Sequence, residues 1–176
     1  LKSGGAATTQ AGKASLVAMT SGAESVTANG NDTVLAGSGS DTISAGSGSV
    51  SVAGGTGPLT FIGGSGSAVV TLQPGTTSAL TLNGAALVNM AGATTVTGGS
   101  NPDLYNFDNG YGGADRINGF RIGTDHLDLI GFWATVDQQV LAGATNSAAG
   151  TVLKLPDGTQ ITLAGIHSVT SSIFGQ

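Results

Sequence analysis

A short repeat in the first half of the chain constrains its fold more than any other feature. A five-residue pattern, Gly-x-(acidic or apolar)-(Ser, Thr or Val)-apolar, recurs with glycine-to-glycine steps of 8, 9, 9, 9 and 9 residues. The repeats begin at Gly22, Gly30, Gly39, Gly48, Gly57 and Gly66. Units this short cannot bury their own apolar side chains, so they must stack on one another. The repeat therefore predicts a solenoid.

Each unit divides into a turn and a strand. Glycine and serine form a tight turn, for which glycine also offers positive φ at little cost. The residues that follow form a short strand with one apolar side chain facing inward. Two units make a coil of about 18 residues, and coils stack about 4.8 Å apart. The expected inward column is Val26, Val34, Ile43, Val52, Phe61 and Val70.

The strand rhythm continues after the glycine register fades at residue 71. Apolar segments follow at 79–82, 86–89, 94–96 and 104–107, which gives about ten strands and five coils over residues 18–107. Residues 1–15 are mostly small and polar, and we expect residues 1–17 to be a linker or the start of a fragment. Residues 108–176 are expected to cap the coils and to carry a secretion-type end. The expected fold is all-β, a parallel β-roll or β-solenoid.

The C-terminal third carries its own local signals. Residues 135–142 place apolar side chains at helical spacing and end before a glycine, which predicts a short helix. Residues 151–155 and 159–163 alternate apolar and polar side chains around Pro156-Asp157-Gly158. That pattern predicts a β-hairpin as part of the cap.

The repeat resembles the nonapeptide G-G-x-G-x-D-x-U-x (U apolar) of the repeats-in-toxin (RTX) family. Residues 36–44, Ala-Gly-Ser-Gly-Ser-Asp-Thr-Ile-Ser, are a nearly complete copy, and residues 27–35 are a good one. In that family the aspartate and the turn carbonyls enclose calcium, a hard cation that takes six to eight oxygen ligands. The resemblance therefore implies Ca2+ as a cofactor.

The acidic position of the repeat is only partly filled. It holds Glu24, Asp32 and Asp41, and then three apolar residues, Val50, Leu59 and Ala68. Loops on the same side of a solenoid are two units apart, so Glu24 should lie over Asp41, whereas Asp32 should lie over Val50. Glu24 and Asp41 are therefore the expected calcium ligands in the repeats, and few ions are expected in all.

A second group of acids follows the repeats. Five of the ten acidic residues lie between 103 and 128: Asp103, Asp108, Asp115, Asp125 and Asp128. Residues 113–129 resemble the segment that closes the roll in serralysin-type secreted proteins, roughly D-x-I-x-D-F-x-x-G-x-D-x-I-D-L, with Asn118 in place of one acid. The resemblance implies that these five acids also bind calcium. The alternative is a solvated cap loop that holds no metal.

Composition excludes several functions. Only 9% of residues are charged, the five Lys and Arg leave a net charge of −5, and no nucleic-acid footprint is expected. No apolar run is long enough to span a membrane. No known catalytic motif is present, and an enzyme is not expected. A polar group of Tyr111, Asp115, Arg116 and His126 leaves open a polysaccharide-processing site. Trp133 is expected to plug the open solenoid end, with a sugar-stacking platform as the alternative.

These expectations lead to one principal function and one alternative. Gly165-Ile166 and Ser172-Ile173-Phe174 resemble the tail that a type I exporter reads in secreted RTX proteins. We expect a non-catalytic module, extracellular or on the cell surface, that extracellular calcium folds after export; any enzymatic activity of the parent protein would lie upstream. The alternative is a self-assembling surface-layer, matrix or adhesin protein with a cell-surface or polysaccharide ligand.

Overall fold

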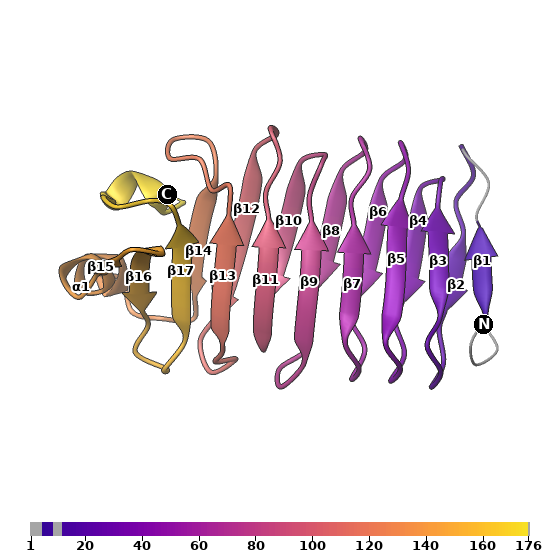
Figure 1. Cartoon of the computed structure of the whole chain (residues 1–176), viewed down its shortest axis with the longest axis horizontal. Coiled ribbons are helices and arrows are strands. Elements are labelled where there is room, and N and C mark those ends of the chain that lie inside the picture. The colour runs from indigo at the N-terminus through magenta and orange to yellow at the C-terminus, as the bar shows by residue number, and fades with distance from the viewer. Residues whose placement is uncertain (1–4, 9–11, 176) are drawn as a thin grey trace.

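The computed structural model describes residues 5–8 and 12–175, and it shows a parallel β-solenoid (Figure 1). Strands alternate between two sheets, so each pair of consecutive strands makes one coil. The odd-strand sheet contains β1 (Ala6–Thr8), β3 (Ser25–Ala28), β5 (Asp41–Ala45), β7 (Leu59–Ile62), β9 (Thr77–Thr81), β11 (Ala93–Thr97) and β13 (Ala114–Asn118). The even-strand sheet contains β2 (Leu16–Ala18), β4 (Asp32–Leu35), β6 (Val50–Ala53), β8 (Ala68–Thr71), β10 (Ala86–Met90), β12 (Asp103–Asp108) and β14 (His126–Ile130).

The described strands make about seven coils, so the expected count of five is too low. Strands β3 to β12 are the ten strands expected in residues 18–107. One further coil comes from β1 and β2, most of which lie in the segment expected to be a linker; residues 1–4 and 9–11 of that segment lie outside the described residues. The other comes from β13 and β14 in the region expected to be only a cap. Neither coil continues the nine-residue period from which the count was made, although Gly113 and Gly123 stand four residues before the buried Ile117 and Leu127, as in the repeats.

The inward column is confirmed. Pairing between alternate strands is parallel, with Val26 opposite Ile43, Ile43 opposite Phe61, and Val34 opposite Val52. All six expected inward residues are buried, and Phe61 is completely inaccessible. Along each strand, buried and exposed side chains alternate because successive residues point to opposite faces of the sheet. The core is accordingly a narrow double column of apolar side chains between two sheets.

The repeat glycines serve close approach rather than positive φ. No glycine that begins a repeat is among those with positive φ in the described residues. A Cβ built on Gly39 would lie 2.0 Å from the carbonyl oxygen of Gly22, and one on Gly48 would lie 2.1 Å from that of Gly30. Such distances are far inside van der Waals contact. Glycine is therefore required because successive turns stack backbone against backbone.

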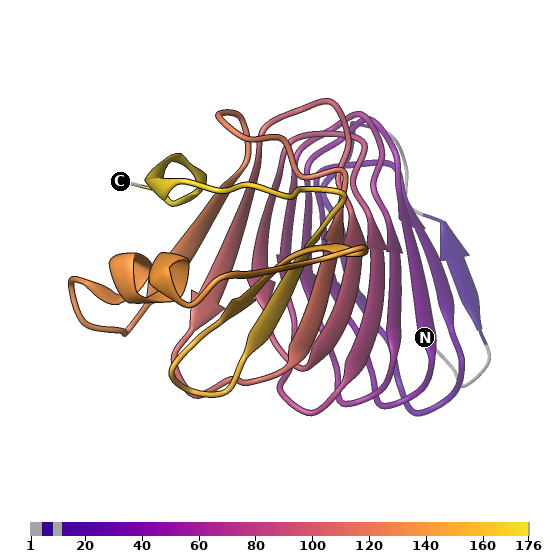
Figure 2. The ribbon, with the colours of Figure 1, turned by 60° about the vertical axis from the view of Figure 1, so that its left-hand side comes forward.

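The C-terminal cap follows the expected plan. Helix α1 (Val136–Ala142) is followed by β15 (Thr145–Ser147), β16 (Gly150–Lys154), β17 (Gln160–Ala164) and a 3-10 turn, η1 (Ser171–Ile173). Strands β16 and β17 form the expected antiparallel hairpin, and β17 also pairs in parallel with β13. The hairpin thus extends the odd-strand sheet, while α1 and η1 lie at the same end of the rod (Figure 2).

Candidate cation sites at the buried carboxylates

Acidic side chains stand at the inward position where several strands begin. The inward positions of the odd-strand sheet hold Glu24, Asp41, Leu59, Ser78, Thr94 and Asp115, and those of the even-strand sheet hold Asp32, Val50, Ala68, Ala86, Asp103 and Asp125. The expected stacking of Glu24 over Asp41 follows from the pairing of Ser25 with Thr42. The middle coils carry the predicted apolar residues Val50, Leu59 and Ala68 there. Ser78 and Thr94 occupy further inward positions for which the sequence made no prediction.

At the cap end, each inward carboxylate connects two coils. The amide of Ala86 donates to Oδ1 of Asp103 at 3.0 Å, and the amide of Thr94 donates to Oδ1 of Asp115 at 3.0 Å. The amide of Asp103 donates in turn to Oδ1 of Asp125 at 3.1 Å. Each donor lies one coil earlier, at the same inward position. These carboxylates therefore satisfy backbone donors that a stacked coil would otherwise leave unpaired.

In the N-terminal coils, the carboxylates bind their own turns. The amide of Gly37 donates to Oδ2 of Asp41 at 2.7 Å, and the amide and hydroxyl of Thr20 donate to Glu24. Burial alone would raise the pKa of Glu24, but these two hydrogen bonds outweigh it and lower the pKa. Oδ1 of Asp41 is buried and has no hydrogen-bond partner. A buried acceptor in this state suits a cation.

Asp115 is the most strongly perturbed of the inward acids. Its side chain is buried, and this burial raises its pKa to about 7, against the opposing effect of the hydrogen bonds with Thr94. Asp108, at the end of β12, lines the same narrow hollow, together with Tyr111 and Thr159. Two of the five acids of the second group therefore border one hollow, but Asp115 is inward on β13, whereas Asp108 is half-buried at an outward position of β12.

Asp103 and Asp125 are a second pair of acids, and the side chain of Arg121 lies beside them. Both are buried, and Asp125 is completely inaccessible. Burial, and then the charge of Asp125, raise the pKa of Asp103 to about 6, although hydrogen bonds and Arg121 act in the opposite direction. A nitrogen of the Arg121 guanidinium lies 3.1 Å from Oδ1 of Asp125. Sequence analysis missed Arg121, although its spacing of four residues from Asp125 was visible.

The other candidate residues are dispersed. Asp128 faces away from the core on β14, where the C-terminal segment packs on it: a Cβ built on Gly175 would lie 1.9 Å from its Oδ1. Arg116 faces outward on β13 and donates to the side chain of Asn118, whereas His126 lies on the other sheet. The four polar residues considered for polysaccharide processing therefore do not converge.

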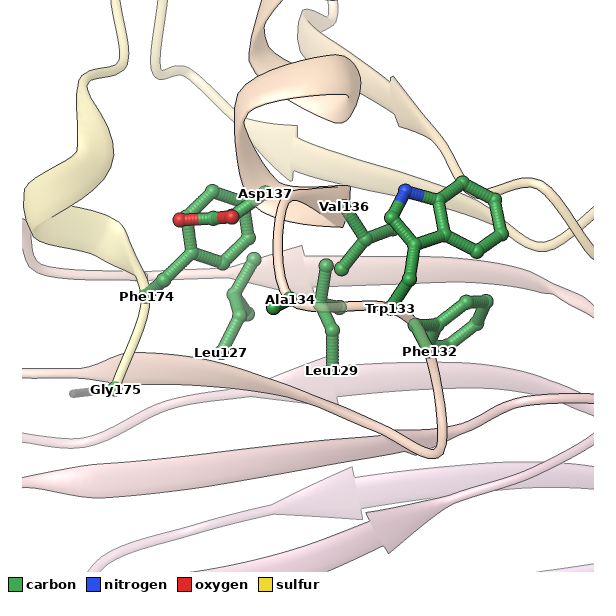
Figure 3. Close-up of a pocket in the computed structure, with 9 residues that line it drawn as sticks. All are labelled: Leu127, Leu129, Phe132, Trp133, Ala134, Val136, Asp137, Phe174 and Gly175. Carbon is green, nitrogen blue, oxygen red and sulfur yellow. The ribbon is translucent and has the colours of Figure 1, made fainter.

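Trp133 does not plug the solenoid, and that expectation is wrong. Its side chain is 49% exposed, because Val136 and Val140 of α1 fill this end of the core with Ile173. Trp133 instead borders a pocket of about 240 Å³ whose other walls come from β14, α1 and the C-terminal segment (Figure 3).

The acids do not form a ready-made metal cluster. Within residues 5–8 and 12–175, no three His, Asp or Glu side chains are grouped closely enough to hold an ion. Any ion at these positions would need backbone carbonyls as well. In the described part of the chain, no helix has the length and apolar character to cross a bilayer. Comparison of the chain with protein-family models and with curated proteins finds no match.

Proposed function

We propose that the chain is a non-catalytic structural module of a type I-secreted bacterial protein and that calcium stabilises its fold outside the cell. The observation that supports this most directly is the burial of carboxylates without a cationic side chain, above all Asp115 and Asp41. A buried charge lacking a partner opposes folding, because it loses its hydration without compensation. A cation supplied by the medium would remove that cost.

In this proposal calcium would bind at two places. One is the turn of Asp41, whose Oδ1 is buried without a partner, with Glu24 one coil below. The other is the hollow that Asp108 and Asp115 both border, which is too narrow for a water molecule, so its walls would have to move apart as the ion binds. Calcium at these places would neutralise carboxylates and hold adjacent turns together. The chain's own residues would supply carboxylate and carbonyl oxygens, the ligands that this ion prefers.

In this proposal, mass action links folding to export. Inside the cell calcium is scarce, so the buried carboxylates oppose folding and the chain stays suitable for an exporter. Outside, an ion that binds the folded chain and not the unfolded chain stabilises it by RT ln(1 + [L]/Kd). Folding and calcium binding are therefore one coupled step in this proposal.

The test is thermal unfolding at pH 8 with a calcium chelator and with millimolar calcium. We expect calcium to raise Tm in the parent chain, and we expect Asp41→Asn and Asp115→Asn each to reduce that gain. Asp137→Asn on α1, outside both inward columns, is the matched control and should keep the full gain. Isothermal titration calorimetry gives the binding heat independently.

One pair of results would contradict the proposal. Calorimetry without a calcium-binding heat, together with an unchanged Tm, would leave a metal-free solenoid. The alternative of a surface-layer, matrix or adhesin protein would then be favoured. Sedimentation of the chain with and without calcium would test that alternative directly, because it requires self-association.

A further inference from the structure

We infer that the guanidinium of Arg121 is a tethered cation that stands where a metal ion would bind between two successive turns. The two turns are residues 98–103, which lead into β12, and residues 119–125, which lead into β14. The inference disagrees with the expectation that Asp103 and Asp125 bind calcium. It concerns this end of the roll alone and does not depend on calcium binding elsewhere.

The turn of Arg121 is built like the turn of Gly37. The amide of Arg121 donates to Oδ2 of Asp125 at 2.7 Å, and the amide of Gly37 donates to Oδ2 of Asp41, four residues later, also at 2.7 Å. At Gly37 a Cβ would lie 1.6 Å from the carbonyl oxygen of Thr20, so no side chain fits there. Arg121 therefore takes the place of a turn glycine and adds a positive charge.

The guanidinium donates hydrogen bonds to oxygen atoms of both turns. It donates to the carbonyl oxygen of Ser100 at 2.6 Å, to that of Asn101 at 2.5 Å, and to Oδ1 of Asp125 at 3.1 Å. Two turn carbonyls and a carboxylate are the oxygen types that a hard cation takes from stacked loops. A planar guanidinium can donate to several of them at once because its N–H groups form a fixed fork.

The charge balance at this place also fits a built-in counter-ion. Asp103 and Asp125 occupy successive inward positions, and both are buried. Arg121 supplies the positive charge next to them, whereas Arg116, on the neighbouring coil, points outward and donates to the side chain of Asn118. No second cation would be needed to hold residues 98–103 against residues 119–125.

The experiment compares Arg121→Ala with the matched control Arg116→Ala. Both are made in a chain that also carries Asp41→Asn and Asp115→Asn, so that calcium at the proposed sites does not mask the result. In chelator, Arg121→Ala should lower Tm by roughly 5–10 °C, because it leaves two buried carboxylates without their cation. Arg116→Ala should change Tm by no more than about 1–2 °C, since the Arg116 side chain is exposed.

Addition of metal distinguishes a cation site from a general packing role. Millimolar calcium should restore at least half of the Tm that Arg121→Ala loses, while the same ionic strength of sodium chloride should not. The chain that keeps Arg121 should not respond. An Arg121→Ala protein as stable as Arg116→Ala, or one destabilised without any response to calcium, would overturn the inference.

A second variant decides the outcome if Arg121→Ala does not fold in either condition. Arg121→Lys keeps the positive charge and loses the fork. It should fold, with a smaller loss of Tm, and should gain little from calcium because its ammonium group still occupies the place. An unfolded lysine variant, or one that responds to calcium, would overturn the inference. The background chain already lacks the two calcium sites of the proposed function. A failure of the Arg121 inference is therefore distinguishable from a failure of the proposed function.

Discussion

Replacing Asp115 by asparagine should stabilise the protein, and increasingly so as the pH rises. Burial raises the pKa of Asp115 to about 7 from the ordinary value of 3.8 for this side chain. The difference corresponds to about 4 kcal/mol of cost for the ionised carboxyl in the folded state. Asparagine has no charge to bury and keeps an oxygen that can accept the hydrogen bond from the amide of Thr94.

The sign and the pH window follow from proton binding. Between pH 4 and pH 7 the folded protein holds a proton on Asp115 that the unfolded chain has released, so stability falls as the pH rises. The advantage of Asp115→Asn over the parent chain should therefore be near zero below pH 4. It should grow by about 1.4 kcal/mol per pH unit and level off at about 4 kcal/mol above pH 7.

Denaturant unfolding at pH 4, 5, 6, 7 and 8 in the presence of a calcium chelator measures this difference. The matched control is Asp157→Asn in the cap hairpin. Burial would raise the pKa of Asp157, but hydrogen bonds from Thr159 and Gly110 outweigh it and lower the pKa. That carboxylate stabilises the fold above pH 4, so its replacement should destabilise at neutral pH. A stability difference for Asp115→Asn that is constant from pH 4 to 8 would refute the reasoning.

Two further substitutions test the core and the turns. Phe61→Ala removes a fully buried ring and should lower the free energy of unfolding in denaturant by about 3–5 kcal/mol. Ile62→Ala, at the outward-facing neighbour, should lower it by under about 1 kcal/mol. Equal losses would show that the register is wrong. Gly48→Ala would place a Cβ 2.1 Å from a backbone oxygen. It should lower the free energy of unfolding, measured by thermal unfolding, by about 1–3 kcal/mol. Gly143→Ala, with its nearest atom at 3.5 Å, should be tolerated, and a tolerated Gly48→Ala would contradict backbone stacking.

The repeat predicted the inward column because a period of nine residues fixes which residues share a face. Val26, Ile43 and Phe61 are stacked as expected, and Pro156-Asp157-Gly158 marked the hairpin correctly. The outer coils were missed for a physical reason. In β13 the glycine spacing is present, since Gly113 precedes the buried Ile117 by four residues just as Gly39 precedes Ile43. The glycine-to-glycine steps around it, from Gly99 to Gly113 and on to Gly123, are 14 and 10 residues, so the nine-residue period does not reveal it.

The orientation of the acids was present in the sequence but was not used. Asp41 precedes the inward Ile43 by two residues, and residues two apart in a strand share a face. That parity alone places the carboxylate inward, where it becomes a hydrogen-bond acceptor for the turn. By contrast, the contacts of Arg121 with Ser100 and Asn101 span about 20 residues and depend on how coils stack. No local pattern predicts them.

The direction of the hydrogen bonds has a mechanical consequence. Strand β1 and the cap lie at opposite ends of the rod, and the bonds between coils run along its length (Figure 1). Tension applied between the ends would load the coils in series, so all coils would bear the same force. A terminal coil would peel away first, because it is hydrogen-bonded to a neighbour on one side only. The 18 residues from Asp41 to Leu59 form one such coil. Each release would lengthen the chain by about 60 Å, so the rod would yield in steps at low force and would act as an extensible spacer.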